Sequence, residues 1–275
     1  MLGLLHGCIV ISPSEISVMK KASVLFFVMI VSIITAQAQS KKQQKEKKGT
    51  VYFAFGSHRT FYSPSDITLK RKDNAFDFTL YNVKAKDEGG VRFHTAPQFS
   101  YTVGYYFKKK GFGLEYHYDH IKYFMTQNQV VKMNGMINGK IYDTDTMLTK
   151  DFVQLEHSDG GNYAMINIVK WFPVVSDKKG NHTLDLIATG GFGLVNPKTN
   201  TTILGNHRDD KYHISGYVIG LETGLKYSFF KNFYVSATFK GAYANYSQFL
   251  IANGYGHQRW FSAQLIYLLG AQFPL

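Results

Sequence analysis

Apolar and polar residues alternate along much of this sequence, and that alternation limits the fold more than any other feature. A period of two residues is the period of a β-strand, whose successive side chains point to opposite faces. The clearest row of alternate apolar residues is Phe99, Tyr101, Val103, Tyr105 and Phe107. Eight segments with this pattern predict an all-β chain, at residues 51–61, 98–107, 112–119, 162–172, 184–194, 217–229, 235–243 and 261–275.

The composition favours strands that cross a membrane. Aromatic residues make up 16% of the chain, yet the mean hydropathy is −0.17, and no segment after residue 38 has the apolar length of a transmembrane helix. Membrane barrels combine alternation with aromatic girdles in this way. A soluble lipocalin-like binder is the alternative, but it would cover its outside with charge, whereas the polar rows here are mostly Gly, Ser and Thr.

The N-terminus predicts export. Met19, Lys20 and Lys21 precede an apolar run over residues 22–36, and an Ala-x-Ala cleavage site follows at residues 36–38. We therefore expect a signal peptide over residues 1–38, with translation starting at Met19. The single cysteine, Cys8, lies in the stretch ahead of Met19, so the mature chain has no thiol for a disulfide, a lipid or a metal.

A basic segment follows the signal. Residues 40–49 hold five lysines and one glutamate without an apolar residue, which predicts a basic disordered tail over residues 39–50. The formal net charge of +12 is partly concentrated there. A solvated spacer is the favoured interpretation of this tail, and contact with anionic lipid or peptidoglycan is the alternative. Nucleic acid is not an expected partner, because an exported chain does not meet it.

The connections between the segments alternate in length. Residues 63–96, 124–161 and 195–211 are long and polar, and residues 250–257 form a link of middling length, whereas residues 108–111, 173–182 and 230–232 are short. Long outer loops and short periplasmic turns are typical of outer-membrane barrels. An even strand count then places both termini in the periplasm. Within the second long link, Asn138-Gly139 predicts a β-hairpin.

These features together resemble the eight-stranded outer-membrane barrels of the OmpA-transmembrane-domain and OmpX type, over residues 51–275. The resemblance implies an antiparallel up-and-down transmembrane β-barrel in the bacterial outer membrane, in contact with outer-membrane lipid and lipopolysaccharide and inserted by the barrel assembly machinery. It implies a structural or surface-interaction role. Such proteins usually end in an aromatic residue, whereas this chain ends Gln272-Phe273-Pro274-Leu275.

Ionisable residues fall on the polar rows and predict a charge network that fills the lumen. An eight-stranded barrel is just wide enough to be filled by side chains, so buried charges must pair. We expect Glu115 and Glu222 to pair with Lys226, Lys240 or Arg59. A narrow small-solute channel is the alternative. The expected network comprises Arg59, Glu115, His117, Asp119, Asp185, Glu222, Lys226 and Lys240.

One cluster has the residue types of an acyl-transfer site. His157, Ser158 and Asp159 would suit a lipid A-modifying hydrolase of the outer leaflet. Neighbouring strand residues point to opposite faces, however, and Ser-Asp-Gly-Gly-Asn is a turn sequence, so a loop turn is the favoured interpretation. The same objection meets Ser57-His58. An enzyme is not the favoured interpretation, and no cofactor is expected.

Other polar residues predict contacts rather than catalysis. Of His117, Asp119 and His120, only His117 and Asp119 share a face of their strand. A metal site would need two ligands from different strands, and no other spacing supports one, so no metal site is expected. The cations of the long links would lie near lipid A phosphates if those links are outside the cell. They are Lys70, Arg71, Lys72, Arg92, Arg208 and Lys211. The sequence does not name an extracellular ligand.

Overall fold

The computed structural model describes residues 48–87, 98–209 and 211–275. The secondary structure of these residues consists of seventeen strands. In the same part of the chain no helix is long and apolar enough to span a membrane. The predicted signal peptide, residues 1–38, lies outside the described residues, as does most of the predicted tail. The first strand begins at Gly49, so the end of the tail segment is already part of the sheet.

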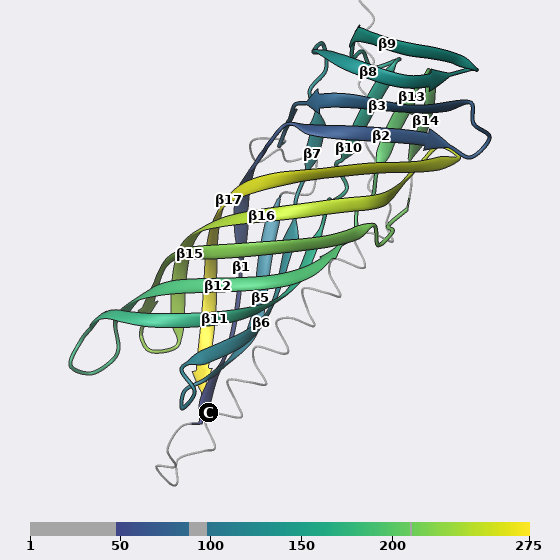
Figure 1. The fold of residues 1–275 in the computed structure, drawn as a ribbon. Helices are drawn as coiled ribbons and strands as arrows, with labels where there is room; N and C mark the ends of the chain where they lie inside the picture. Colours follow the sequence, from purple (N-terminus) through teal and green to yellow (C-terminus); the bar gives the residue numbers. More distant parts are fainter. Residues whose placement is uncertain (1–47, 88–97, 210) are drawn as a thin grey trace, which may run out of the picture. The chain divides into compact units, whose positions relative to one another are not determined.

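Eight antiparallel strands close into a barrel, which confirms the predicted fold class and strand count. Each strand pairs with the next in the order β1-β5-β6-β11-β12-β15-β16-β17, and β17 pairs with β1 to complete the circle. Figure 1 shows this wall of tilted strands. Its members are β1 (Gly49–Tyr62), β5 (Phe99–Phe107), β6 (Phe112–His120), β11 (Tyr163–Ser176), β12 (Thr183–Val195), β15 (Gly216–Phe229), β16 (Phe233–Ile251) and β17 (Gly254–Pro274).

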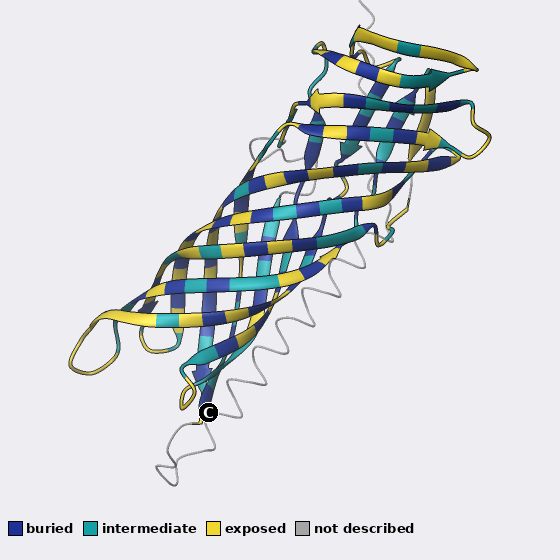
Figure 2. Cartoon of the chain, viewed as in Figure 1, coloured by how far each residue is buried: buried dark blue, intermediate teal, exposed yellow. Residues whose placement is uncertain are grey.

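The alternation of residue types follows the two faces of the wall. On β15, Leu221 is 74% exposed, whereas Lys226 is 2% exposed and faces the interior. The same change from residue to residue runs along the other barrel strands (Figure 2). An apolar outer face around a polar interior is the pattern of a barrel whose solvent is lipid.

Two groups of aromatic side chains mark the limits of this apolar face. One contains Tyr217, which lies between Phe192 and Tyr243, with ring centroids 6.1 and 6.4 Å apart. The other contains Tyr227, whose ring centroid is 6.3 Å from that of Phe229. Both tyrosines are on β15. At ~3.4 Å per residue and a tilt of ~40°, they are separated by ~26 Å across the membrane, the height of a barrel's apolar band.

The ends of the barrel carry very different connections. The C-terminus, the start of β1 and three short turns lie at one end, where the Lys48 N–H donates to the Leu275 carbonyl oxygen at 2.8 Å. The long links lie at the other end, as the alternation of lengths predicted. One prediction was wrong: residues 250–257 are not a loop of middling length. β16 and β17 continue through them to a two-residue turn, because their pairing extends to Ile251 and Gly254.

The long links fold into further strands. We call these strands the cap, and we include in it the ends of β16 and β17 next to their shared turn. Four of these strands extend the barrel sheet from the first residues of β17, in the order β17-β2-β3-β8-β9. The other five form a second sheet, in the order β14-β13-β10-β7-β4. Figure 1 shows them gathered at the end opposite the C-terminus. They are β2 (Ser65–Arg71), β3 (Phe76–Val83), β4 (Ala85–Lys86), β7 (Tyr123–Met125), β8 (Val130–Ile137), β9 (Lys140–Met147), β10 (Val153–His157), β13 (Asn200–Ile203) and β14 (Asn206–Asp209).

The two sheets of the cap pack on each other around one hydrophobic core. Ile67, Leu69 and Leu80 of the first sheet belong to the same buried cluster as Val153 and Leu155 of the second. This arrangement makes the cap a β-sandwich that shares β16 and β17 with the barrel wall. The cap is therefore a folded head and not a set of separate loops.

Aromatic side chains continue this core into the mouth of the barrel. The Trp260 ring stacks on Tyr246 at 4.4 Å and on Tyr123 at 4.7 Å between centroids. Its indole N–H donates to the Tyr163 hydroxyl at 3.0 Å. All four rings are buried. We call these four residues the aromatic stopper, because they fill the lumen where the barrel meets the cap.

Glycine at position 135 is required by the pairing of β8 with β3. Gly135 has φ +140°, and a Cβ there would lie 2.3 Å from the Asp77 carbonyl oxygen. By contrast, Gly139 has φ +77° in open space, in the hairpin turn that the Asn138-Gly139 pair predicted.

We expect Gly135→Val to detach the β8–β9 hairpin and leave the barrel folded. Strained backbone costs on the order of 1–3 kcal/mol, and the collision adds to it. Limited proteolysis of the folded protein should cut the hairpin rapidly in this variant, whereas Gly139→Ala should stay much closer to wild type. Equal protection in both variants would show that β8 is not held in the described register.

Candidate functional site

A buried ion pair crosses the lumen from one wall to the other. Lys240 of β16 donates to the Asp119 carboxylate of β6, with Nζ and Oδ2 2.5 Å apart. Their side chains are 1% and 0% exposed. Because β6 and β16 lie four strands apart in a barrel of eight, this pair links opposite walls. An ion pair without access to water must be well matched, since the loss of one partner leaves a bare buried charge.

Asp119 has two further polar partners. His117 Nε2 lies 2.8 Å from Oδ1, and the Ser100 hydroxyl donates to the same oxygen at 2.5 Å. The Ser100 oxygen in turn accepts from His58 Nδ1 at 2.9 Å. Four strands thus contribute to a network centred on one carboxylate. Charge-assisted hydrogen bonds of this kind hold their groups in fixed positions.

The pairing of the two glutamates differs from the expected one. Glu115 is buried and Glu222 is partly buried, but neither forms an ion pair with Lys226 or Lys240 within the described part of the chain. Instead, His117 Nδ1 lies between them, 3.5 Å from Glu115 and 3.8 Å from Glu222. The histidine takes the place that the sequence assigned to lysine.

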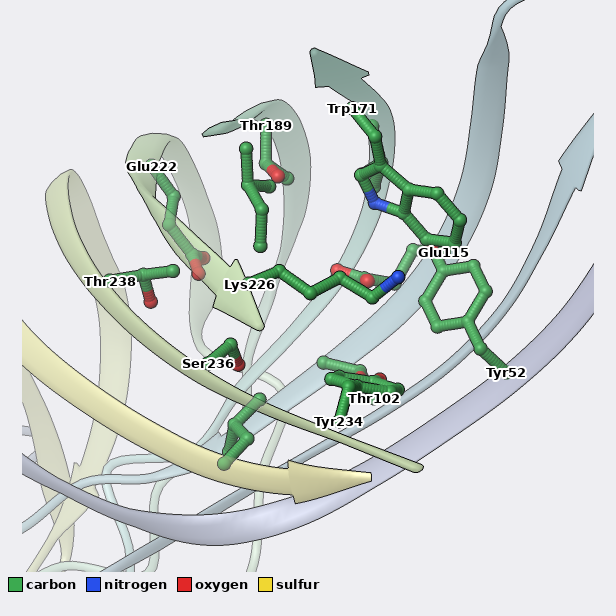
Figure 3. A pocket seen from close by; sticks show the side chains of 13 residues that line it. Tyr52, Thr102, Glu115, Trp171, Thr189, Glu222, Lys226, Tyr234, Ser236 and Thr238 are labelled. Carbon is green, nitrogen blue, oxygen red and sulfur yellow. The ribbon is translucent and has the colours of Figure 1, made fainter. Parts of the chain in front are cut away.

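Lys226 closes the lumen nearer to the C-terminus. Its ammonium lies 3.7 Å from the centre of the Trp171 ring and 2.6 Å from Gln272 Oε1, with Asp185 at 3.9 Å. Figure 3 shows Lys226 extending across a cavity of about 30 Å³. One or two water molecules fit in that volume. The stacking of Trp171 on Tyr106, 4.2 Å between centroids, completes this closure.

The assignment of Arg59 to the lumen was wrong. Arg59 is exposed, whereas its neighbours His58 and Thr60 are buried. The reason is strand parity, since Arg59 belongs to the same outward row as Phe55 and Phe61. Its partner across the sheet is Leu265, another outward residue.

The structure separates the three residues of the enzyme-like cluster. His157 ends β10 and its Nδ1 lies 2.9 Å from the Thr199 hydroxyl. The Ser158 oxygen accepts from Asn200 at 3.0 Å, and Asp159 pairs with Lys198. Each side chain thus contacts a different partner, so the described geometry provides no relay from carboxylate to imidazole to hydroxyl.

His157 is part of the cap core. Its ring is 0% exposed and stacks on Tyr246, 5.1 Å between centroids and 7° between planes. The ring edge meets Phe249, and Trp260 lies 6.0 Å away. Burial in this aromatic environment lowers the pKa of His157 to about 3. The imidazole is therefore neutral at any physiological pH and packs as an aromatic side chain.

The remaining candidate groups have structural partners. Ser57 is exposed on the outer face, away from His58. His120 Nδ1 lies 2.9 Å from Asn162, and no group of three His, Cys, Asp or Glu side chains in the described ranges is arranged to hold a metal ion. Among the long-link cations, Lys70 pairs with Asp77 and Arg71 with Asp73. Lys72 lies over the Tyr255 ring, while Arg92 lies outside the described residues.

Several lumen residues were missed at the sequence level. His58 and Ser100 face inward by parity with Tyr52 and Thr102, so strand alternation was sufficient to find them. Trp171 lies on the same inward row of β11 as Met165 and Val169. Both rows of β11 contain large apolar residues, so the sequence did not show which row faces the lumen.

No protein-family model and no curated protein sequence matches this chain. Among solved structures, Neisserial surface protein A is 10% identical and gives a TM-score of 0.34, covering 82% of this chain and 97% of its own. The N-terminal β-barrel domain of Pseudomonas aeruginosa OprF is 14% identical with a TM-score of 0.33, covering 82% and 98%. The outer membrane protein OprG of the same organism is 11% identical with a TM-score of 0.34, covering 85% and 100%.

The class of this protein follows from its own geometry. A closed sheet of eight antiparallel strands, an apolar outer face between two aromatic girdles and a filled polar lumen define an outer-membrane-type β-barrel. The cap adds a β-sandwich to one end of that barrel.

We expect Lys240→Met to lower the free energy of unfolding by about 3–5 kcal/mol, because it leaves Asp119 buried without its counter-charge. The double variant Lys240→Met with Asp119→Asn should recover part of the loss. Guanidinium unfolding of the protein in lipid vesicles measures both. Lys132→Ala, which breaks an exposed pair with Asp143, is the control and should change little. A Lys240→Met variant as stable as this control contradicts the role of the cross-lumen pair.

We expect His157 to make the cap less stable as the pH falls. The folded pKa of about 3 lies below the unfolded value of 6.5. Between these values the unfolded chain binds a proton that the folded cap does not. The contribution of the neutral His157 to cap stability is therefore fully present above about pH 6.5 and is lost as the pH falls toward 3. The unfolding equilibrium constant should rise by up to about tenfold per pH unit relative to His157→Phe.

Trp260 reports on this transition, because its ring lies in the same cluster as His157. The chain has two tryptophans, so a Trp171→Phe background leaves Trp260 as the single fluorophore. The comparison is made between this background and the same protein with His157→Phe. A stability difference that does not change between pH 7 and pH 4 would show that His157 is not buried as a neutral ring.

Proposed function

We propose that this protein is a surface protein of the outer membrane, in which the sealed barrel is the anchor and the cap is the part that interacts with the surroundings. The observation that carries the proposal is the filled lumen. The aromatic stopper, the Lys240–Asp119 pair and Lys226 close the barrel at successive levels. A barrel that is closed in this way serves to hold the cap at the membrane.

The proposed orientation places the cap outside the cell and both termini in the periplasm. It is supported by the lengths of the connections, since the turns at the terminal end are short and the links at the other end form the cap. Entry of the chain from the periplasm with the barrel assembly machinery fits this orientation. Phe273 on the last strand stacks on Phe53 at 6.3 Å, within the apolar row of the barrel.

The edge of the first cap sheet is a place for a protein partner. Among the described strands β9 pairs only with β8, and most of its side chains are exposed. An unpaired strand edge offers main-chain donors and acceptors to an added strand. Asp143 and Asp145 would meet each other if two copies of β9 paired antiparallel about Thr144, which disfavours self-association at this edge.

The other candidate functions receive less support. A channel requires a continuous path, and the described lumen has a cavity of about 30 Å³ behind Lys226. A hydrolase requires a nucleophile beside its base, whereas Ser158 and His157 contact separate partners. A soluble binder is opposed by the outward apolar row, in which Leu221 is 74% exposed.

An epitope tag inserted between Asn138 and Gly139 tests the proposed orientation. This turn lies at the tip of an exposed hairpin, where insertions are tolerated. We expect antibody to label the tag on intact cells. The matched control is the same tag at Gly180, in a short turn at the opposite end, which should be labelled only after the cells are permeabilised.

Labelling of Gly180 on intact cells, without labelling of the hairpin, would reverse the orientation. Recovery of the protein in a soluble fraction would contradict the membrane anchor itself. Migration on gels with and without boiling separates these outcomes, because a folded membrane barrel shifts on heating whatever its orientation.

A further inference from the structure

A groove of about 370 Å³ opens on the outer surface where the barrel meets the cap. It lies at the point where the chain passes from β1 to β2, next to β16 and β17. Both the wall of the barrel and the first strands of the cap contribute to it. The residues that matter for its chemistry are Ser63, Asp66, Asn82, Tyr243, Arg259 and Phe261.

The floor of the groove is apolar and belongs to the cap-side girdle. The rings of Tyr243 and Phe261 lie 5.1 Å apart, and Tyr243 continues the row of rings through Tyr217. Phe261 is 66% exposed. Girdle aromatics lie at the boundary between hydrocarbon and headgroups, so the groove begins where a lipid's acyl chains end.

A cation stands directly above this floor. Arg259 precedes Phe261 by two residues, on the cap side of it, and is exposed on the same outward face of β17. No carboxylate in the described part of the chain forms an ion pair with it, whereas Lys70 and Arg71 of the cap are both paired. A guanidinium at headgroup height is matched in geometry to a phosphate.

The cap side of the groove supplies polar groups that are held in place by the backbone. The Asp66 carboxylate accepts the Asn82 N–H at 2.9 Å, and Asn82 has φ 55°. The Ser63 hydroxyl accepts the Phe261 N–H at 3.0 Å. A carboxylate repels a bare phosphate but accepts hydrogen bonds from hydroxyl groups. The combination therefore favours a ligand that carries both a phosphate and hydroxyls.

We propose that this groove binds a phosphorylated glycolipid of the outer leaflet. The phosphate lies on Arg259, the sugar hydroxyls on Asp66 and Asn82, and the first methylene groups on Tyr243 and Phe261. The assignment to the outer leaflet rests on the proposed function, because it requires the cap to be outside the cell. The bound lipid would fix the cap's first sheet relative to the membrane surface.

Binding to the folded protein in detergent tests this proposal without reference to orientation. Native mass spectrometry counts the bound ligand for a diphosphoryl glycolipid, for the same glycolipid without its phosphates, and for inorganic phosphate. We expect the diphosphoryl form to bind about tenfold tighter than the dephosphorylated form. Arg259→Gln should remove most of that preference. Arg59→Gln is the matched control, since Arg59 is also outward and exposed but does not line the groove.

Each other outcome overturns the proposal. Equal binding of both glycolipids removes the role of the phosphate, and an equal loss in Arg59→Gln shows general attraction to positive charge. Displacement of the glycolipid by millimolar inorganic phosphate identifies free phosphate as the ligand. A shift on gels after boiling confirms that each variant is folded. These results do not depend on the tag experiment, so the groove and the orientation fail separately.

Discussion

The ion pair between Lys240 and Asp119 is the interaction on which the rest of the barrel depends. Both side chains are buried, and they come from strands on opposite walls. In a lumen without bulk water neither charge is tolerable alone, so the pair fixes the distance between the walls. His117, Ser100 and His58 extend the same constraint to neighbouring strands. The barrel is thus held from inside as well as by its closed ladder of backbone hydrogen bonds.

A second constraint is that β17 serves two structures at once. Its residues from Ser262 onward pair with β1 in the barrel, and Gly254 to Gln258 pair with β2 in the cap. The aromatic stopper lies at this change of partner, where Trp260 contacts residues from both parts. The lumen and the cap core are consequently one continuous interior, in which the buried charges around Asp119 adjoin the apolar core of the cap and a second apolar cluster includes Tyr52 and Tyr234. Sealing the barrel and folding the head therefore use the same side chains.

The barrel was predictable from the sequence because membrane strands follow a strict period of two. The segment predicted at residues 98–107 differs from β5 (Phe99–Phe107) by one residue, and the lumen positions of Glu115 and Lys240 followed from parity. Arg59 was wrongly assigned to the lumen because the prediction followed its charge, although its position in the alternation places it in the outward row of β1. The ion-pair partners in the lumen could not be predicted from the sequence, because the tilt of the strands determines which charged side chains lie opposite one another. The Lys240–Asp119 contact joins residues that no local pattern connects.

The cap was only partly predictable. Its Asn138-Gly139 hairpin has a local turn signal, which the structure confirms. The two-sheet arrangement has none, because its strands are short and are brought together by a core assembled from several distant links. His157 illustrates the same limit. Its neighbours Ser158 and Asp159 suggested chemistry, but its burial between aromatic rings from β16 and β17 was decided by the tertiary fold.

Electrical recording is the most direct test of the proposed role of the barrel as a closed anchor. The folded protein is inserted into planar lipid bilayers at neutral pH, and the current is followed at a steady voltage. A sealed lumen predicts no discrete conductance steps for the wild type. Regular steps from the folded wild-type protein would contradict the account, because they require a path through the aromatic stopper and past the Lys240–Asp119 pair.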